Sequence, residues 1–178
     1  MRPFAHWHRK ALRKIPLPLA ALSDTVKLSV HSQGVFMATI NRLNESLSVA
    51  PQLQPEDMAE LAKAGFKTVL NNRPDGESED QPSSAELAAA AEAAGLEYAH
   101  QPVVGNNISD VDIDGFDAIV SLAEQPVLAF CRTGTRCTTL WALTQADEQD
   151  NASILATAEQ AGYDLSQLAD RLDQRRGQ

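Results

Sequence analysis

The segment 127–137, Val-Leu-Ala-Phe-Cys-Arg-Thr-Gly-Thr-Arg-Cys, contains the two residues best suited to chemistry, Cys131 and Arg136. Its apolar start predicts a buried strand that ends at Cys131, followed by a short loop and a helix near Arg136. Loop N–H groups, the helix N-terminus and the guanidinium would all favour a thiolate. A pKa shifted from about 8.5 to roughly 5 would leave the thiol almost wholly ionised at neutral pH. We predict that Cys131 is a nucleophile and that Arg136 binds the oxygens of a phosphate or sulfur oxyanion.

The residues between these two are predicted to shape the loop and to line the bound anion. Gly134 lets the backbone fold tightly around the ligand. The hydroxyls of Thr133 and Thr135 can donate to the ligand or to the thiolate, or can instead cap the following helix. The backbone of Arg132 belongs to the same substrate-binding loop, and its side chain is expected to lie in solvent.

Cys137 follows Arg136 directly and has two interpretations. The first is a packed residue at the start of the helix, because free cysteines are often buried. The second is a resolving thiol, which would form a disulfide with an oxidised or persulfidated Cys131.

Short apolar runs alternate with longer amphipathic ones from residue 47 onward, a pattern typical of α/β proteins. A capping box at Ser83 and Glu86 and glycines at positions 65 and 95 mark helix ends. We predict a central, mainly parallel sheet of four or five strands flanked by helices. The expected strands are 47–50, 66–71, 96–102 and 127–131, and the expected helices are 55–65, 83–95, 109–124, 138–149 and 152–175, the last interrupted near Gly162.

Arg73 and Asp75 follow the second predicted strand, at the sheet edge where ligands bind in open α/β folds. Either side chain can therefore contact the substrate. The letters Asn-Arg-Pro-Asp-Gly also form an ordinary turn sequence, so both interpretations remain open here.

From about residue 40 to the C-terminus the chain resembles the phosphatase-like domain of bacterial beta-lactamase-hydrolase-like proteins, which is related to protein-tyrosine and dual-specificity phosphatases. The segments that carry the resemblance are 47–49 (Leu-Ser-Val), 71–77 (Asn-Asn-Arg-Pro-Asp-Gly-Glu), 81–86 (Gln-Pro-Ser-Ser-Ala-Glu) and 131–136 (Cys-Arg-Thr-Gly-Thr-Arg). The resemblance implies a tyrosine-phosphatase-like fold and a cysteine-dependent hydrolase. In that enzyme Cys131 would form a phosphocysteine and Arg136 would bind the phosphoryl group.

The chain departs from the phosphatase pattern in its loop and in its general acid. Tyrosine phosphatases have five residues between cysteine and arginine, and here Cys131 and Arg136 enclose four. Residues 103–107, Val-Val-Gly-Asn-Asn, contain no acid where such phosphatases carry an aspartate, so Asp75, Asp110 and Asp112 are the candidate general acids.

The six-residue loop also resembles that of rhodanese-type sulfurtransferases. This alternative implies a persulfide on Cys131 and a role in sulfide or thiosulfate metabolism. An oxyanion-binding module without turnover is a third hypothesis.

Charge divides the 178 residues into two parts: residues 1–36 carry about +5 and the remainder about −14. We therefore expect a basic N-terminal extension, 1–36, outside the core, and one domain, 37–178. A net charge of −9 disfavours nucleic acid as a partner, and no apolar run suits a membrane span. Two cysteines close in sequence suggest a reducing, cytoplasmic setting. We expect no metal, no cofactor, and a small anionic substrate, either a phosphate ester or a sulfur oxyanion.

Overall fold

The computed structural model describes residues 25–26 and 39–177. Its sheet has the strand order β1-β2-β3-β6-β4-β5. The strands are β1 (Thr25–Val26), β2 (Ile40–Arg42), β3 (Leu47–Ala50), β4 (Thr68–Asn71), β5 (Glu97–His100) and β6 (Val127–Phe130). Strands β3, β6, β4 and β5 pair in parallel, and β2 and β1 continue the sheet antiparallel. The prediction of a mainly parallel α/β sheet is confirmed, with two short antiparallel strands beyond the four that periodicity indicated.

Strand β6 lies at the centre of the parallel part. Ala129 pairs with Val49 of β3 on one side and with Leu70 of β4 on the other. All residues of β3, β4 and β6 are buried, as expected for parallel strands that helices cover on both faces. Cys131 therefore begins its loop at the middle of the sheet edge, between the ends of two neighbouring strands.

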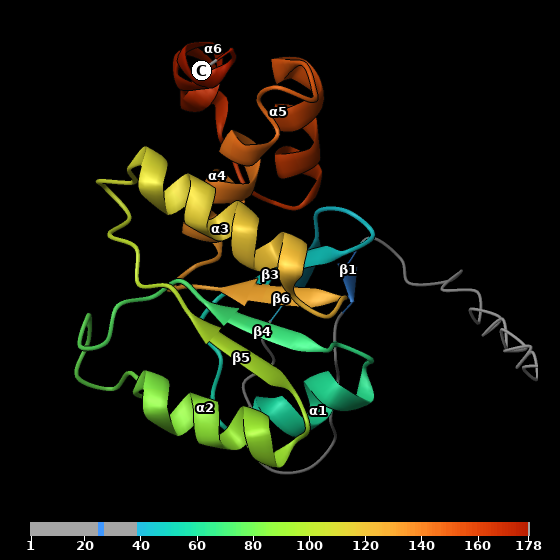
Figure 1. Cartoon of the computed structure of the whole chain (residues 1–178), viewed down its shortest axis with the longest axis vertical. Helices are drawn as coiled ribbons and strands as arrows, with labels where there is room; N and C mark the ends of the chain where they lie inside the picture. The colour runs from blue at the N-terminus through green and yellow to red at the C-terminus, as the bar shows by residue number, and fades with distance from the viewer. Residues whose placement is uncertain (1–24, 27–38, 178) are drawn as a thin grey trace, which may run out of the picture.

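Helices cover the two faces of the sheet in separate groups (Figure 1). The face with α1 (Asp57–Lys63) and α2 (Ser84–Ala93) has a core that includes Met58, Leu87 and Phe130. The other face packs a larger core that includes Phe116 and Trp141. Its helices are α3 (Asp110–Leu122), α4 (Thr135–Thr144), α5 (Asn151–Gln160) and α6 (Ala169–Arg175), with the 3-10 helix η1 (Ser166–Leu168) before α6.

Two helix starts show how local sequence sets the element boundaries. The capping box predicted at Ser83 and Glu86 is present at the start of α2. The helix expected to begin near Arg136 is present, because α4 begins at Thr135, whereas the periodicity range 138–149 starts three residues late. Gly134 adopts the left-handed conformation with φ 90° at the N-cap, which ends the loop early and places Arg136 in the first turn.

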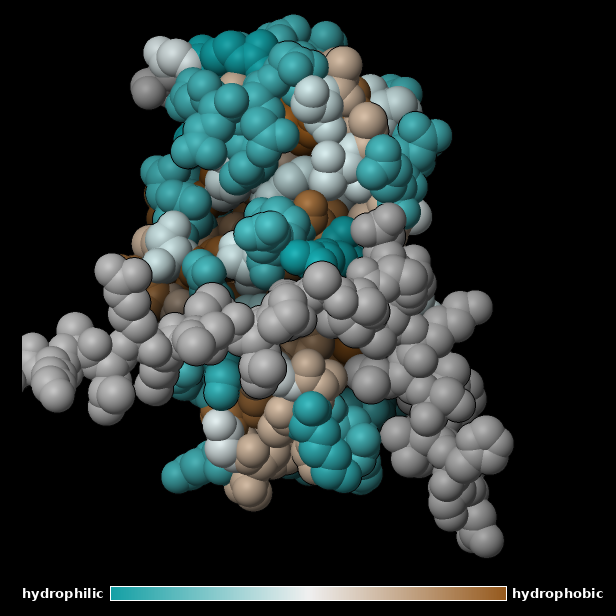
Figure 2. All heavy atoms as spheres, turned by 90° about the vertical axis from the view of Figure 1, so that its right-hand side faces the viewer, coloured by the Kyte–Doolittle hydropathy of each residue, from teal (hydrophilic) through white to brown (hydrophobic). Residues whose placement is uncertain are grey.

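The expected basic extension, 1–36, lies outside the described residues except for β1. Its separation from the core therefore stays a prediction. In the described part of the chain, no helix is both long and apolar enough to cross a membrane. On the face shown in Figure 2, hydrophilic side chains cover most of the upper part, with hydrophobic atoms visible between them.

Candidate active site

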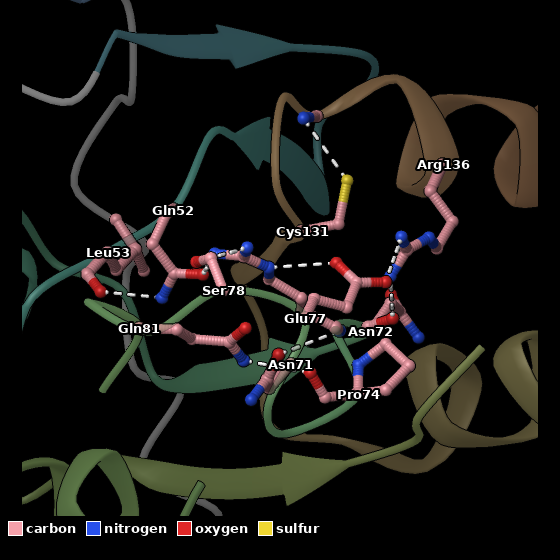
Figure 3. A network of polar contacts seen from close by, with 12 residues as sticks. Gln52, Leu53, Asn71, Asn72, Pro74, Glu77, Ser78, Gln81, Cys131 and Arg136 are labelled. Atoms are coloured by element: carbon pink, nitrogen blue, oxygen red, sulfur yellow. Dashed lines mark hydrogen bonds and ion pairs between the residues drawn. The ribbon is translucent and has the colours of Figure 1, made fainter. Parts of the chain in front are cut away.

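The loop between β6 and α4 folds back on the thiol of Cys131. The backbone N–H of Gly134 donates a hydrogen bond to Cys131 Sγ, with 3.2 Å between nitrogen and sulfur (Figure 3). Cys131 is only 1% exposed, and Gly134 is buried too. The sulfur is thus held inside the loop against backbone amides, which is an environment that favours a thiolate.

The pKa of Cys131 is lowered to about 5. The largest cause is a hydrogen bond with the thiol of Cys137; burial opposes the shift, and the N–H groups of Cys137, Thr133 and Gly134 add to it. The sequence predicted contributions from the amides, the helix N-terminus and Arg136. The structure adds the thiol of Cys137 as the largest cause, while the Arg136 guanidinium binds Asn72 and Glu77.

Cys137 is fully buried, and its Sγ also lies 3.4 Å from Asn72 Oδ1. Burial raises the pKa of Cys137 well above its ordinary value, and the charge on Cys131 raises it further. Cys137 therefore keeps its proton and acts as the hydrogen-bond donor of the pair. A resolving thiol attacks as a thiolate, so this environment disfavours that role, which stays a prediction.

Arg136 is held by the segment that follows β4. Its Nη1 donates to the carbonyl oxygen of Asn72 at 2.8 Å, and its Nη2 forms an ion pair with Glu77 Oε1 at 2.7 Å. Its Nε is buried and has no hydrogen-bond partner among the described residues. The guanidinium is thus positioned by the segment after β4, and its Nε, which lies next to Gly105, keeps a donor that no described residue uses.

Glu77 joins two arginines: its Oε2 binds Arg73 Nε at 2.9 Å while its Oε1 binds Arg136 (Figure 3). Burial alone would raise the pKa of Glu77, but the hydrogen bonds from Arg73 and Arg136 lower it. Arg73 also donates to Gln52 Oε1 and Ser78 Oγ. Each guanidinium nitrogen of Arg73 has a protein partner, so a contact between Arg73 and substrate would require one of these bonds to break.

The candidate acids have partners away from Cys131. Asp75 accepts hydrogen bonds from the N–H and hydroxyl of Ser84, which lower the pKa of Asp75. Asp110 is 62% exposed and pairs with Arg175 at 3.2 Å. Asp112 belongs to the capping box at the start of α3. The structure therefore does not bring any of these three carboxylates to the loop.

The remaining predicted residues of the loop lie at its outer surface. Arg132, Thr133 and Thr135 are exposed, and the Thr133 hydroxyl donates to Thr135 Oγ1 at 3.1 Å. Glu77 and Asn72 stand in the quoted motif 71–77 but received no role from the sequence. The only sequence signal for Glu77 was an acid four residues after Arg73. The described residues contain no group of three or more His, Cys, Asp or Glu side chains that could hold a metal ion.

Comparison with known proteins identifies this architecture. Residues 39–148 match the model of the phosphatase-like domain of beta-lactamase hydrolase-like proteins. The chain belongs to this family. A beta-lactamase hydrolase-like protein of Agrobacterium fabrum is 43% identical over 105 residues, which are 59% of this chain and 24% of that protein. The chain spans about a quarter to a third of the length of the curated relatives that it matches.

Solved structures with the same fold support the family assignment. A structure from Neisseria meningitidis described as "a putative phosphatase" is 40% identical, with a TM-score of 0.71, and covers 76% of this chain and 96% of that chain. A structure of P. aeruginosa TpbA in complex with pTyr has a TM-score of 0.57 over 77% of this chain and 87% of that chain. At 16% identity, TpbA shows the shared fold alone. The resemblance to the phosphatase-like domain is thus confirmed.

Proposed function

We propose that the domain is a cysteine-dependent phosphatase-like hydrolase acting on small phosphate esters, with Cys131 as its nucleophile. The observation that carries this proposal is a thiol with a pKa of about 5 inside a loop of backbone N–H groups. Such a thiolate is ready to attack at neutral pH without a separate general base. The membership of the phosphatase-like family supports phosphate as the anion that is bound.

In the proposed reaction the thiolate attacks phosphorus, an S–P bond forms, and the P–O bond to the ester oxygen breaks. The leaving oxygen takes a proton from solvent, since the candidate acids lie elsewhere. Water then attacks the phosphocysteine, the S–P bond breaks, and phosphate and the thiolate are regenerated. Loop amides and the free N–H of Arg136 Nε would stabilise the charge on the phosphoryl oxygens in both steps.

A rhodanese-like sulfurtransferase is the second candidate, and the position of the acids favours it. In this reaction Cys131 attacks the outer sulfur of thiosulfate, an S–S bond forms, and sulfite leaves with the electron pair of the broken bond. The persulfide then passes its outer sulfur to an acceptor thiol. Sulfite is a good leaving group, so this chemistry works without a general acid. It is therefore compatible with Asp75 and Asp110 having their partners outside the loop.

Intact-mass measurement separates these functions. The whole chain is incubated with an aryl phosphate or, separately, with thiosulfate. The phosphatase predicts phosphate release and a trapped adduct of about 80 Da, and the sulfurtransferase predicts about 32 Da that cyanide removes. Cys131→Ser should abolish both results. Persulfidation without phosphate release would make the sulfurtransferase the better-supported function. Anion binding without any adduct would indicate a binding module without turnover.

A thiol that must stay ionised and reduced also favours a reducing compartment. We therefore propose a cytoplasmic location for the domain.

A further inference from the structure

The side chain of Tyr163 lies directly against Gly134, the residue whose N–H binds the Cys131 sulfur. A Cβ atom on Gly134 would lie only 2.0 Å from Tyr163 Oη and 2.7 Å from Cζ. The tyrosine hydroxyl thus occupies the space that a side chain would need at position 134. Glycine is required here by this close approach as well as by the positive φ of 90°.

Tyr163 is itself held in place from several directions. Its hydroxyl oxygen accepts a hydrogen bond from Asn41 Nδ2 of strand β2 at 3.1 Å. Its backbone N–H donates to the carbonyl of Ala158 at the end of α5 at 2.8 Å. Its neighbours Ala161 and Leu165 are buried in the core with it. The contact with Gly134 is therefore part of a packed arrangement.

We propose that Tyr163, held by Asn41, is a positioning residue that keeps the Gly134 N–H on the sulfur of Cys131. The inference rests on the proposed role of Cys131 and deepens it. It also extends the site beyond residues 39–148, which match the family model, into the segment that follows α5.

The electrostatic surroundings agree with a neutral hydroxyl at this position. Burial raises the pKa of Tyr163, outweighing the hydrogen bond from Asn41, and the charge on Cys131 adds to the rise. Cys137 of α4 is the other titratable group near both side chains: it forms a hydrogen bond with Cys131 and adds to the raised pKa of Tyr163. The Arg136–Glu77 pair lies on the side of the segment after β4. Because the hydroxyl is neutral, Tyr163→Phe removes no charged group from the site.

The test is the pH dependence of Cys131 alkylation in the whole chain carrying Tyr163→Phe. Iodoacetamide labelling at Cys131 is followed by mass spectrometry from about pH 4 to pH 8. We expect the midpoint to rise by about 0.5 to 1 pH unit, so that labelling at pH 5 slows roughly two- to fivefold. The thermal midpoint of unfolding should match that of the control, because the ring is retained.

Tyr98→Phe is the matched control. The Tyr98 hydroxyl also accepts a hydrogen bond from an asparagine amide, Asn71 Nδ2 at 2.9 Å, and it lies on β5. This control should leave the labelling midpoint unchanged. Asn41→Ala, which removes the donor but keeps the Tyr163 hydroxyl, should raise the midpoint by a smaller amount.

An unchanged labelling midpoint in Tyr163→Phe would overturn the proposal, whether or not the variant melts earlier. An equal rise in Tyr98→Phe would overturn it too, because the effect would then be general. Failure of the proposed function looks different: the wild-type chain itself would label with an ordinary thiol midpoint.

Discussion

Strands β4 and β5 end at the same edge of the sheet, yet the segments that follow them make different contacts with Arg136. Segment 71–78 binds its guanidinium through the Asn72 carbonyl and the Glu77 carboxylate. Segment 102–109 contains no acid, and its Gly105 lies against the guanidinium, where a Cβ would be 3.1 Å from Arg136 Nε. Val104, Asn106 and Asn107 of this second segment are exposed.

This difference separates two tasks of a phosphate-transferring site. Binding and stabilising the anion is prepared by hydrogen bonds that are already formed, so little reorganisation is needed during the reaction. Proton delivery to the leaving group has no such preformed arrangement, because the second segment, 102–109, contains no acidic side chain. We therefore expect activity to depend strongly on the anion-binding residues and on the leaving group, and weakly on the candidate acids.

The largest expected effect is the dependence on the leaving group. Without a positioned acid, an aryl phosphate should be hydrolysed at least about 100-fold faster than phosphoserine, since general acid catalysis contributes about 10²- to 10⁴-fold. The measurement is kcat/KM for a series of esters whose leaving groups differ in pKa. Similar rates across the series would show that a residue does protonate the leaving oxygen, and the comparison of the two segments would fail.

The next effect concerns the anion clamp itself. Arg136→Lys should lose at least about 10-fold in kcat/KM, because an ammonium cannot reproduce the planar guanidinium that Asn72 and Glu77 orient. Arg42→Lys is the control, since Arg42 lies on β2 and donates to the Asn44 carbonyl. Near-wild-type turnover and anion affinity in Arg136→Lys would assign Arg136 a structural role only.

A smaller effect is expected at the thiol that lowers the pKa of Cys131. Cys137→Ala removes the donor, so the labelling midpoint of Cys131 should rise from about 5 toward its ordinary value. A rise of one pH unit would slow labelling at pH 5 by about fivefold. Cys137→Ser retains a donor and should keep the midpoint low. If Cys137→Ala and Cys137→Ser give the same labelling midpoint, the hydrogen bond from residue 137 is not the cause of the low pKa of Cys131.

The smallest effect is predicted for Asp110, the candidate acid that directly follows the second segment. Asp110→Asn should change kcat/KM by no more than about twofold, because it removes an exposed ion pair with Arg175, and such pairs contribute little. The pH–rate profile should keep its shape. A loss of 100-fold or more, together with a lost basic limb of the profile, would identify Asp110 as the general acid after movement of the second segment.

Much of the fold was predictable from local patterns. The buried run 47–50 coincides with β3, and the capping box at Ser83 starts α2, because both signals are encoded within a few residues. The loop motif predicted the start of α4 near Arg136, but helical periodicity placed it three residues late, at 138. Its position depends on Gly134 in a left-handed conformation, which the helical periodicity of the following residues does not reveal.

The same distinction between local and long-range signals applies to the candidate site. Cys131, Gly134 and Arg136 were identifiable as candidates because they lie within six residues of one another, in a loop that needs only a strand before it and a helix after it. Contacts across longer separations could not be identified in this way. The bridge from Glu77 to Arg136 and the contact of Tyr163 with Gly134 join segments that meet only when the sheet and helices pack.

The sequence by itself therefore determined the class of fold and the thiol most suited to nucleophilic chemistry, since apolar periodicity and a short loop act over neighbouring residues. Tertiary structure decided which groups surround that thiol. It placed the thiol of Cys137 where it can donate a hydrogen bond to the Cys131 sulfur, and it occupied Arg73 and Asp75 with other partners. It also brought Tyr163, held by Asn41, against the loop. The physical reason is that hydrogen bonds and charge act over a few ångströms in space, regardless of separation along the chain.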